Sequence, residues 1–446
     1  MYINNLGPIK EGNIRFNDLV VIWGKNNSGK TMLTYLLYSI REEFIKFSFN
    51  FSLIKENGEL YKRINKGESV KISRTEMRSL YKQFQEYFEE NSAKIISTYY
   101  EVDINQFKNF KIRFEEDEIY NLFPLKQKKS RGRVNQRVNG ETIVSTLFFV
   151  VEEDYIEFGL YKYDIEREQF SDDAELESQK QIELQFSKDR FNDYFSGFIK
   201  FMSNMSKSIY FPAERIGINQ FRRELKTERA NLSFYYDEQK NRNKYPIPIE
   251  DYIRFIFSIQ NQKINENHSY LGAVHSLNNG EFIYDEISDE FLFTNDSYDE
   301  SVPFNMISSS LKSLLGFTEY LKRSRMLRSS MLFIDEPEMN LHPEKQVELM
   351  ELMEKIILEE NTKIILSTHS NFITRKLLNT LLSSYVQNDE TNLNEDNVNI
   401  YEINNGKIGK FDAIKAHSFI KNFDDVLDDL DSEYFSLINK MQREEL

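Results

Sequence analysis

Short apolar runs alternate with helical patterns in two parts of the chain. Leu19–Trp23 is apolar throughout, and residues 31–47 follow with apolar side chains at helical spacing. Met331–Ile334 and Lys363–Leu366 have the character of two more strands, with a proline-initiated helix over Pro343–Glu359 between them. Short apolar strands separated by helices are typical of a parallel sheet that is covered on both faces. The pattern therefore predicts an α/β fold with a mostly parallel core sheet.

The elements predicted elsewhere are less regular. Residues 1–16 predict strands, and Asn405-Gly406 predicts the turn of a hairpin formed by Val398–Ile403 and Lys407–Phe411. Polar residues 262–300 and 384–397 predict loops, the first with short strands, and the acidic residues 424–433 predict a solvated helix. The other expected strands are Ile95–Val102, Phe107–Phe114, 146–163 and Ser208–Phe211, and the other expected helices are Tyr81–Asn91, 220–231 and Ser308–Lys322.

Composition narrows the class of protein. Of the 446 residues, 40% are hydrophobic and 14% aromatic, which excludes a disordered chain. The chain has no cysteine, which excludes a disulfide framework and a cysteine-based metal site. Its first residues lack the apolar segment of a signal peptide, and no apolar stretch approaches 18 residues, so we expect a cytoplasmic protein without membrane contact.

Residues 24–31 carry the first candidate chemistry. Gly24-Lys25-Asn26-Asn27-Ser28-Gly29-Lys30-Thr31 has the spacing G-x-x-x-x-G-K-[ST] between a predicted strand and a predicted helix. In that setting the N–H groups of the loop and of the helix N-terminus point at phosphate oxygens. We expect Lys30 to reach the β- and γ-phosphates of a nucleotide and Thr31 to bind Mg²⁺. The residues assigned to the nucleotide are Gly24, Asn26, Asn27, Ser28, Gly29, Lys30 and Thr31.

Two further sites follow buried strands. Asp335 and Glu336 end the run Met331–Ile334, at the edge where parallel sheets bind ligands. Asp335 suits Mg²⁺, and Glu336 suits the activation of an attacking water. His369 follows the strand Lys363–Leu366 and can bond a γ-phosphate or that water, although a structural histidine at a strand end is the alternative.

These three elements, in this order, resemble the ABC-class ATPases. The text Asp335-Glu336-Pro337-Glu338-Met339-Asn340-Leu341-His342-Pro343 is similar to that of the OLD/RecF/SMC-like branch (AAA15/AAA21-type) rather than of transporter ATPases. The opening residues 3–10 and Pro212-Ala213-Glu214-Arg215 also resemble that branch. The resemblance implies a P-loop NTPase of the ABC-type head, with an antiparallel β subdomain and helical insertions, that binds and hydrolyses ATP with Mg²⁺.

The resemblance also implies a domain arrangement. We expect one split head over residues 1–446. Its expected parts are a phosphate-loop half (1–47), an insertion with antiparallel strands (48–200), a helical lobe with the signature segment (201–330), and a half with Asp335, Glu336, His369 and the C-terminal tail (331–446).

The family further implies a head-to-tail dimer, or a higher homo-oligomer, with ATP between protomers. The signature segment that would touch the ATP of the opposite protomer corresponds to Ser308, Ser309, Ser310 and Lys312. Ser310 stands where the family has glycine, so a plain helix cap is the alternative. Glu338–Leu341 would cross the dimer interface. The sequence does not identify the Q-loop glutamine of the family, for which Gln106, Gln136 and Gln185 are the candidates.

The same resemblance points to a role in a larger system. ATPases of this kind resemble subunits of bacterial anti-phage defence systems that act with a separate effector, a nuclease or toxin. No acidic nuclease constellation follows His369, so we expect any such activity in another chain. The alternatives are a DNA-repair or chromosome-handling ATPase and a non-hydrolysing ATP-gated scaffold. A transporter ATPase is a third alternative, which the motif sequence disfavours.

Two basic segments are candidates for nucleic acid. Residues 126–137 contain six Lys and Arg with no acid between them, and the segment 222–229 contains Arg222, Arg223, Lys226 and Arg229. Either can contact a phosphate backbone even though the net charge is −15. Solvated loop and helix surfaces are the alternatives. His268, His275 and His417 show no spacing of metal ligands.

Overall fold

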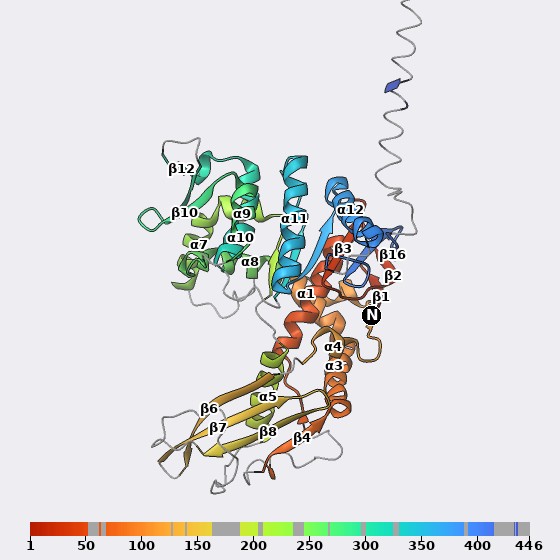
Figure 1. Ribbon diagram of the computed structural model, residues 1–446, viewed down its shortest axis with the longest axis vertical. Coiled ribbons are helices and arrows are strands. Elements are labelled where there is room, and N and C mark those ends of the chain that lie inside the picture. Colours follow the sequence, from red (N-terminus) through yellow and green to blue (C-terminus); the bar gives the residue numbers. More distant parts are fainter. Residues whose placement is uncertain are drawn as a thin grey trace, which may run out of the picture. The chain divides into compact units, whose positions relative to one another are not determined.

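The computed structural model divides into two compact units. It describes residues 1–51, 62–63, 68–125, 128–138, 141–162, 188–203, 208–234, 245–265, 268–295, 300–323, 330–387, 391–413, 432 and 434–435. The larger unit comprises residues 1–41, 92–112 and 206–446, and the smaller comprises 42–91 and 113–205 (Figure 1). The insertion is therefore not continuous in sequence, because residues 92–112 belong with the larger unit.

A mixed sheet forms the centre of the larger unit. Its described strands run in the order β5-β1-β2-β16-β15-β3-β14-β13-β9. Their bounds are β1 Tyr2–Leu6, β2 Ile9–Asn13, β3 Leu19–Gly24, β5 Lys111–Arg113, β9 Ile209–Phe211, β13 Met331–Asp335, β14 Lys363–Thr368, β15 Val398–Asn404 and β16 Lys407–Phe411. The consecutive strands β15, β3, β14, β13 and β9 are parallel, which confirms the predicted fold class.

Strand β3 lies inside this parallel core. All six of its residues are buried, and it pairs in parallel with β14 on one side and β15 on the other. An all-apolar strand suits a position with both faces covered. The carboxyl ends of β3, β13 and β14 consequently lie at one edge of the sheet, where the three sequence motifs begin.

Helices cover the sheet and bury aromatic side chains against it. The helices α1 Lys30–Lys46, α11 Pro343–Glu360 and α12 Asn371–Gln387 follow β3, β13 and β14. On α1, the ring of Tyr38 lies 5.2 Å from that of Phe333 on β13, and Thr34 shares a buried 2.7 Å hydrogen bond with Tyr210 on β9. The core thus joins the helix after the phosphate loop to the strand that ends in Asp335.

A helical lobe precedes β13 within the same unit (Figure 1). Its helices are α6 Arg215–Gln220, α7 Arg222–Phe234, α8 Ile247–Ser258, η4 Ile259–Asn261, α9 Leu271–Asn278, η5 Phe304–Met306 and α10 Ser309–Arg323. Its antiparallel strands are β10 Glu281–Asp285, β11 Glu290–Thr294 and β12 Val302–Pro303. The loop prediction for 262–300 is wrong at α9, where Val274 and Leu277 are buried on one helical face.

An antiparallel sheet organises the smaller unit, in the order β4-β8-β7-β6. The strands are β4 Val70–Ser73, β6 Lys128–Val138, β7 Glu141–Val151 and β8 Tyr155–Lys162, and the helices are α4 Glu118–Leu122, α5 Lys188–Met202 and the first part of α3 Arg74–Tyr100. On one face, Phe158 of β8 packs on Phe195 of α5 with ring centroids 4.2 Å apart. This sheet is the predicted antiparallel subdomain.

Two strand predictions are corrected by α3 and by the short helix after it. Residues 95–100, expected as a strand, form the last turns of α3, and Ile96 and Tyr99 are buried at helical spacing. Residues 104–107 form the 3-10 helix η2 (Ile104–Phe107), so the strand expected over Phe107–Phe114 is reduced to β5. Burial of one helical face outweighs the strand preference of isoleucine, threonine and tyrosine in this segment.

Several predicted features fall wholly or partly on residues outside the described part of the chain. Residues 424–433 fall almost entirely outside, as does His417. Residues 128–137 of the basic segment lie in β6, which pairs in an antiparallel register with β7, and residues 126–127 lie outside the described residues. None of the helices among the described residues is both long and apolar enough to cross a membrane.

Candidate nucleotide site

The loop between β3 and α1 is shaped to surround an anion. A Cβ on Gly24 would lie 2.7 Å from the carbonyl oxygen of Ile403, and Gly29 has a φ of +103° that disfavours a side chain. Lys30, only 6% exposed, donates from Nζ to the carbonyls of Gly24 at 2.9 Å and Lys25 at 3.1 Å. Ser28 Oγ is buried and has no hydrogen-bond partner among the described residues. An enclosed ammonium and an unpartnered hydroxyl in one loop fit the phosphates of a nucleotide.

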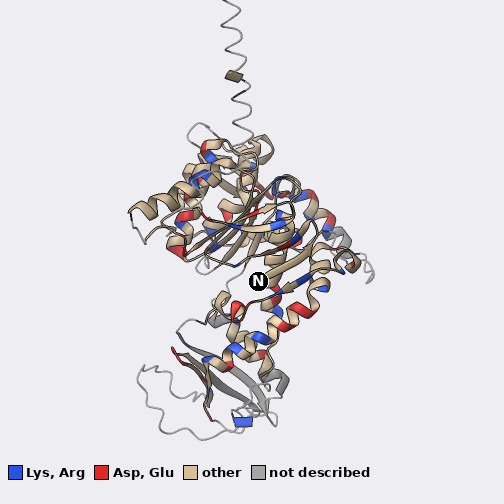
Figure 2. Ribbon diagram, turned by 90° about the vertical axis from the view of Figure 1, so that its right-hand side faces the viewer, with Lys and Arg blue, Asp and Glu red and all other residues tan. Residues whose placement is uncertain are grey.

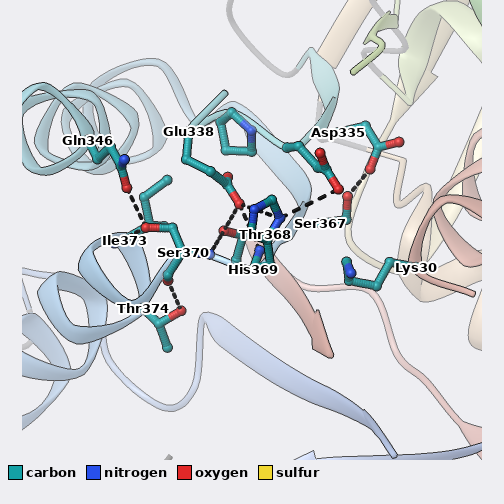
Figure 3. Close-up of polar contacts among 12 residues, drawn as sticks. Lys30, Asp335, Glu338, Gln346, Ser367, Thr368, His369, Ser370, Ile373 and Thr374 are labelled. Atoms are coloured by element: carbon teal, nitrogen blue, oxygen red, sulfur yellow. Dashed lines mark hydrogen bonds and ion pairs between the residues drawn. The ribbon is translucent and has the colours of Figure 1, made fainter. Parts of the chain in front are cut away.

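Thr31 and Asp335 meet across the edge of the sheet. The hydroxyl of Thr31 donates to Asp335 Oδ2 at 2.8 Å. Ser367 at the end of β14 donates to Asp335 Oδ1, as Figure 3 shows. Burial raises the pKa of Asp335 to about 6, although these two hydrogen bonds lower it. A hydroxyl beside a carboxylate at the mouth of a phosphate loop is a donor set that fits Mg²⁺.

Glu336 and His369 form a second polar pair at the same edge. His369 Nδ1 lies 3.5 Å from Glu336 Oε1. The bond to His369 lowers the pKa of Glu336, and the bond to Glu336 raises the pKa of His369. Glu336 also has a φ of +46°, a left-handed conformation that turns the chain sharply after β13. The pair holds an ionised carboxylate beside an imidazole at the end of the parallel strands.

Family comparison agrees with this geometry. The family model of the AAA ATPase domain (AAA_15) matches residues 1–374. The chain belongs to this AAA ATPase domain family. Nucleotide binding and a P-loop NTPase character follow from that membership.

The solved structures that match this ATPase domain are only distantly similar to it. An SMC head bound to the C-winged helix domain of ScpA has 11% identity and a TM-score of 0.35, covering 93% of this chain and 98% of that one. The SMC head domain from Thermotoga maritima has 12% identity and a TM-score of 0.30, covering 92% and 96%. An SMC head with an extended coiled coil, bound to the C-terminal domain of ScpA derived from Pyrococcus furiosus, has 11% identity and a TM-score of 0.32, covering 94% and 98%. No curated protein matches the chain.

Arg215 joins the ATPase motifs to the helical lobe. Its guanidinium is buried and donates to the carbonyls of Asp335 and Glu336, each at 2.9 Å, and to that of Ser313 on α10 at 3.2 Å. Burial lowers the pKa of Arg215, and nearby carboxylates, Glu338 among them, act in the opposite direction. The sequence marks Arg215 through the Pro212–Arg215 motif. Apart from the nearby carbonyl of Pro212, its hydrogen-bond partners are 98 to 122 positions away, and no local spacing predicts them.

The signature candidates lie at the start of α10. Ser308 Oγ accepts a 3.3 Å hydrogen bond from the N–H of Leu311, so Ser308 caps the helix. Ser308 and Ser309 are exposed, whereas Lys312 donates from Nζ to the carbonyl of Asn305 at 3.1 Å. Both of these hydrogen bonds stay within the lobe of the ATPase domain. The cap is thus real, and contact with a second protomer stays a prediction.

Tyr100 is a further neighbour of the phosphate loop. At the end of α3, its hydroxyl donates to the carbonyl of Thr31 at 3.4 Å. Gln106 lies on η2, directly after α3, whereas Gln136 is on β6 in the smaller unit and Gln185 lies outside the described residues. Of the two described glutamines, Gln106 is therefore the one that belongs to the larger unit.

The basic helix α7 is neutralised within its own lobe. Arg222 and Lys226 bind Asp289 at 3.2 and 2.7 Å, and Arg229 binds Glu250 at 2.9 Å. Figure 2 shows acidic and basic residues interspersed over the helices. These cations stabilise the lobe and give no support to a nucleic-acid surface at 222–229. His268 likewise has a structural setting, 3.4 Å from Glu360 and stacked on Tyr270.

Proposed function

We propose that this ATPase domain hydrolyses ATP and acts as a nucleotide-driven dimerisation switch. The observation that supports it best is the contact of Thr31 with Asp335, because two motifs 304 positions apart meet at one point. Lys30, which begins α1, binds a carbonyl of the phosphate loop, and the pair of Glu336 and His369 lies at the same sheet edge. This arrangement has the parts that phosphoryl transfer to water needs, which are mainly positioning and charge stabilisation.

Each side chain has a step to perform. Lys30 exchanges its bonds to the loop carbonyls for the β- and γ-phosphates, and Glu336 accepts a proton from the attacking water. His369 donates to the γ-phosphate while Glu336 holds its ring. Bound Mg²⁺, held by Thr31 and Asp335, would neutralise charge on the phosphates.

The switch would operate between two copies of the chain. The start of α10 and its cap, with Ser308 and Ser309 exposed and Ser310 half-buried, would close on the ATP of the opposite protomer. Arg215 supports this coupling, because it ties Ser313 of α10 to the turn that bears Glu336. Hydrolysis would then separate the protomers and change the state of a separate effector, a nuclease or toxin in anti-phage defence, as the family resemblance suggests.

Phosphate release by the purified chain tests the proposal. With Mg²⁺ and ATP we expect steady turnover by the native sequence and none by Lys30→Ala, which removes the loop's enclosed cation. Equal rates for the two proteins, or turnover by neither, would overturn the proposed hydrolysis. Co-purification of a neighbouring gene product, with ATP-dependent release, tests the effector role separately.

A further inference from the structure

Glu338 is buried within the ATPase domain. It is only 6% exposed, although it lies in the Glu338–Leu341 segment expected to cross a dimer interface. Its Oε1 accepts hydrogen bonds from Thr368 Oγ1 at 2.8 Å and from the main-chain N–H of His369 at 2.7 Å (Figure 3). His369 Nδ1 lies 3.3 Å from the same oxygen. One carboxylate oxygen therefore contacts both the backbone and the ring of the histidine.

The bonds around Glu338 close into a continuous network. Thr368 Oγ1 accepts from the N–H of Ser370 at 2.9 Å, and Ser370 Oγ caps α12 by accepting from the N–H groups of Phe372 and Ile373. Ser370 Oγ also donates to Gln346 on α11, whose Nε2 donates to the carbonyl of Leu341 at 2.9 Å. The segment 338–341 and the loop 368–370 are therefore held together at both ends.

The contacts of His369 divide between two carboxylates with different settings. Glu336 is partly exposed and its carboxylate meets the imidazole, whereas Glu338 is buried and also binds the main chain beneath the ring. The hydrogen bond from the main-chain N–H of His369 to Glu338 fixes the backbone position of His369. The imidazole is thereby already oriented where it contacts Glu336. Outer-shell carboxylates orient functional histidines in the same way at metal sites.

We propose that Glu338 is a positioning residue that acts through His369. It anchors the main chain at His369 and thereby holds the imidazole beside Glu336. The proposal rests on the proposed ATP hydrolysis. Glu338 needs an acceptor oxygen for this role, since both Thr368 and the N–H of His369 are donors, so glutamine can replace it and leucine cannot.

A double-mutant cycle with His369 tests this role. Glu338→Leu should lower kcat by about 10–100-fold, the range seen when the partner that orients a metal-binding histidine is lost. The affinity for ATP, which Lys30 and Thr31 provide, should change less than about twofold. Glu338→Gln should keep kcat within about threefold of the native value. In a His369→Gln background, Glu338→Leu should have no further effect on kcat, because its route to the reaction is already removed.

Matched variants separate positioning from general damage. Glu344→Leu removes the same charge from an exposed site on the first turn of α11 and should leave kcat unchanged. If Glu338→Leu does not fold, Thr368→Ala removes one of the two donors and should lower kcat in the native but not in the His369→Gln background. Independent, multiplicative losses would overturn the proposal, as would full activity of Glu338→Leu. Absence of turnover by the native protein would instead count against the proposed hydrolysis.

Discussion

Arg215 stabilises the turn at Glu336 through a 2.9 Å hydrogen bond from its Nη2 to the carbonyl oxygen of Glu336. The other terminal nitrogen binds the carbonyl of Asp335, and Nε binds Ser313 on α10. A planar fork with five donors can serve several carbonyls at once, which a single ammonium cannot. Arg215 therefore fixes the conformation of Glu336 and links it to the helix that begins at Ser309.

We predict that Arg215→Lys keeps the positive charge but loses the link between the turn at Glu336 and helix α10. Lysine cannot reach all these carbonyls, and each buried polar group left unpaired costs about 1–3 kcal/mol. The free energy of unfolding should fall by about 2–4 kcal/mol in urea titrations, and kcat should fall while ATP still binds. Arg254→Lys, at an exposed position on α8, is the control and should change neither quantity. Native stability of Arg215→Lys would show that the fork is dispensable.

The parts of the site that could be predicted from the sequence are those carried by contiguous motifs. Residues 19–31 combine an apolar strand, a loop and a helix start, and the apolar run before Asp335 fixes the carboxylate at a strand end. Because β3, β14 and β13 are parallel neighbours, these motifs meet at one edge. The contact of Thr31 with Asp335 follows from that geometry.

The parts that could not be predicted depend on contacts between distant segments. The motifs that contain Glu338 and Arg215 can be recognised, but Glu338 bonds Thr368, 30 positions away, and Arg215 bonds the carbonyl of Asp335, 120 positions away. The sequence predicts a strand at the end of α3 because its isoleucines, threonine and tyrosines favour strands in isolation. Only the core that buries Ile96 and Tyr99 selects a helix there.

The raised pKa of Asp335 predicts a pH-dependent cost to stability. The folded protein holds a proton on Asp335 up to a pH of about 6, whereas the ordinary pKa of an aspartate is 3.8. Between those values the folded state binds more protons than the unfolded state, so stability from this group is full below a pH of about 4 and is lost as pH rises through about 6. At about 1.4 kcal/mol per pH unit, the loss is about 3 kcal/mol. Asp335→Asn should therefore melt at a higher temperature than the native protein at pH 8, with a gap that shrinks toward pH 4.

The same variant should lose function as it gains stability. Without the carboxylate, Mg²⁺-dependent binding of ATP should be greatly weakened, as measured by calorimetry with and without Mg²⁺. In the native protein, that Mg²⁺-dependent affinity should fall as pH drops below about 6, because Asp335 becomes protonated. A melting-temperature gap that is constant from pH 4 to pH 8 would contradict the burial of an ionised Asp335.

Glu336→Gln should trap the ATP-bound form. The amide keeps the size of the side chain but cannot accept a proton from water, a loss on the order of 10²–10⁴ in rate. Lys30, Thr31 and Asp335 are unchanged, so ATP should still bind with native affinity. Because ATP would bind the closed pair of protomers, slow hydrolysis should leave that pair populated. Light scattering after size exclusion should show a larger species with ATP than with ADP, and the same mass in both would contradict the switch.

Ser309→Arg in the Glu336→Gln chain should reverse this assembly. Ser309 is the exposed first residue of α10, so a long charged side chain there has room in a single protomer and should leave its melting temperature nearly unchanged. In the closed pair the same side chain would lie between α10 and the phosphates of the opposite protomer, where its bulk prevents approach. Ser383→Arg adds the same group to an exposed position on α12 and should leave the ATP-dependent species intact. ATP binding by each protomer should persist in both variants, since the residues around Lys30 are untouched. If Ser309→Arg assembles with ATP as fully as Ser383→Arg, the start of α10 is not at the interface, and the role of Ser308, Ser309 and Ser310 reduces to capping their own helix.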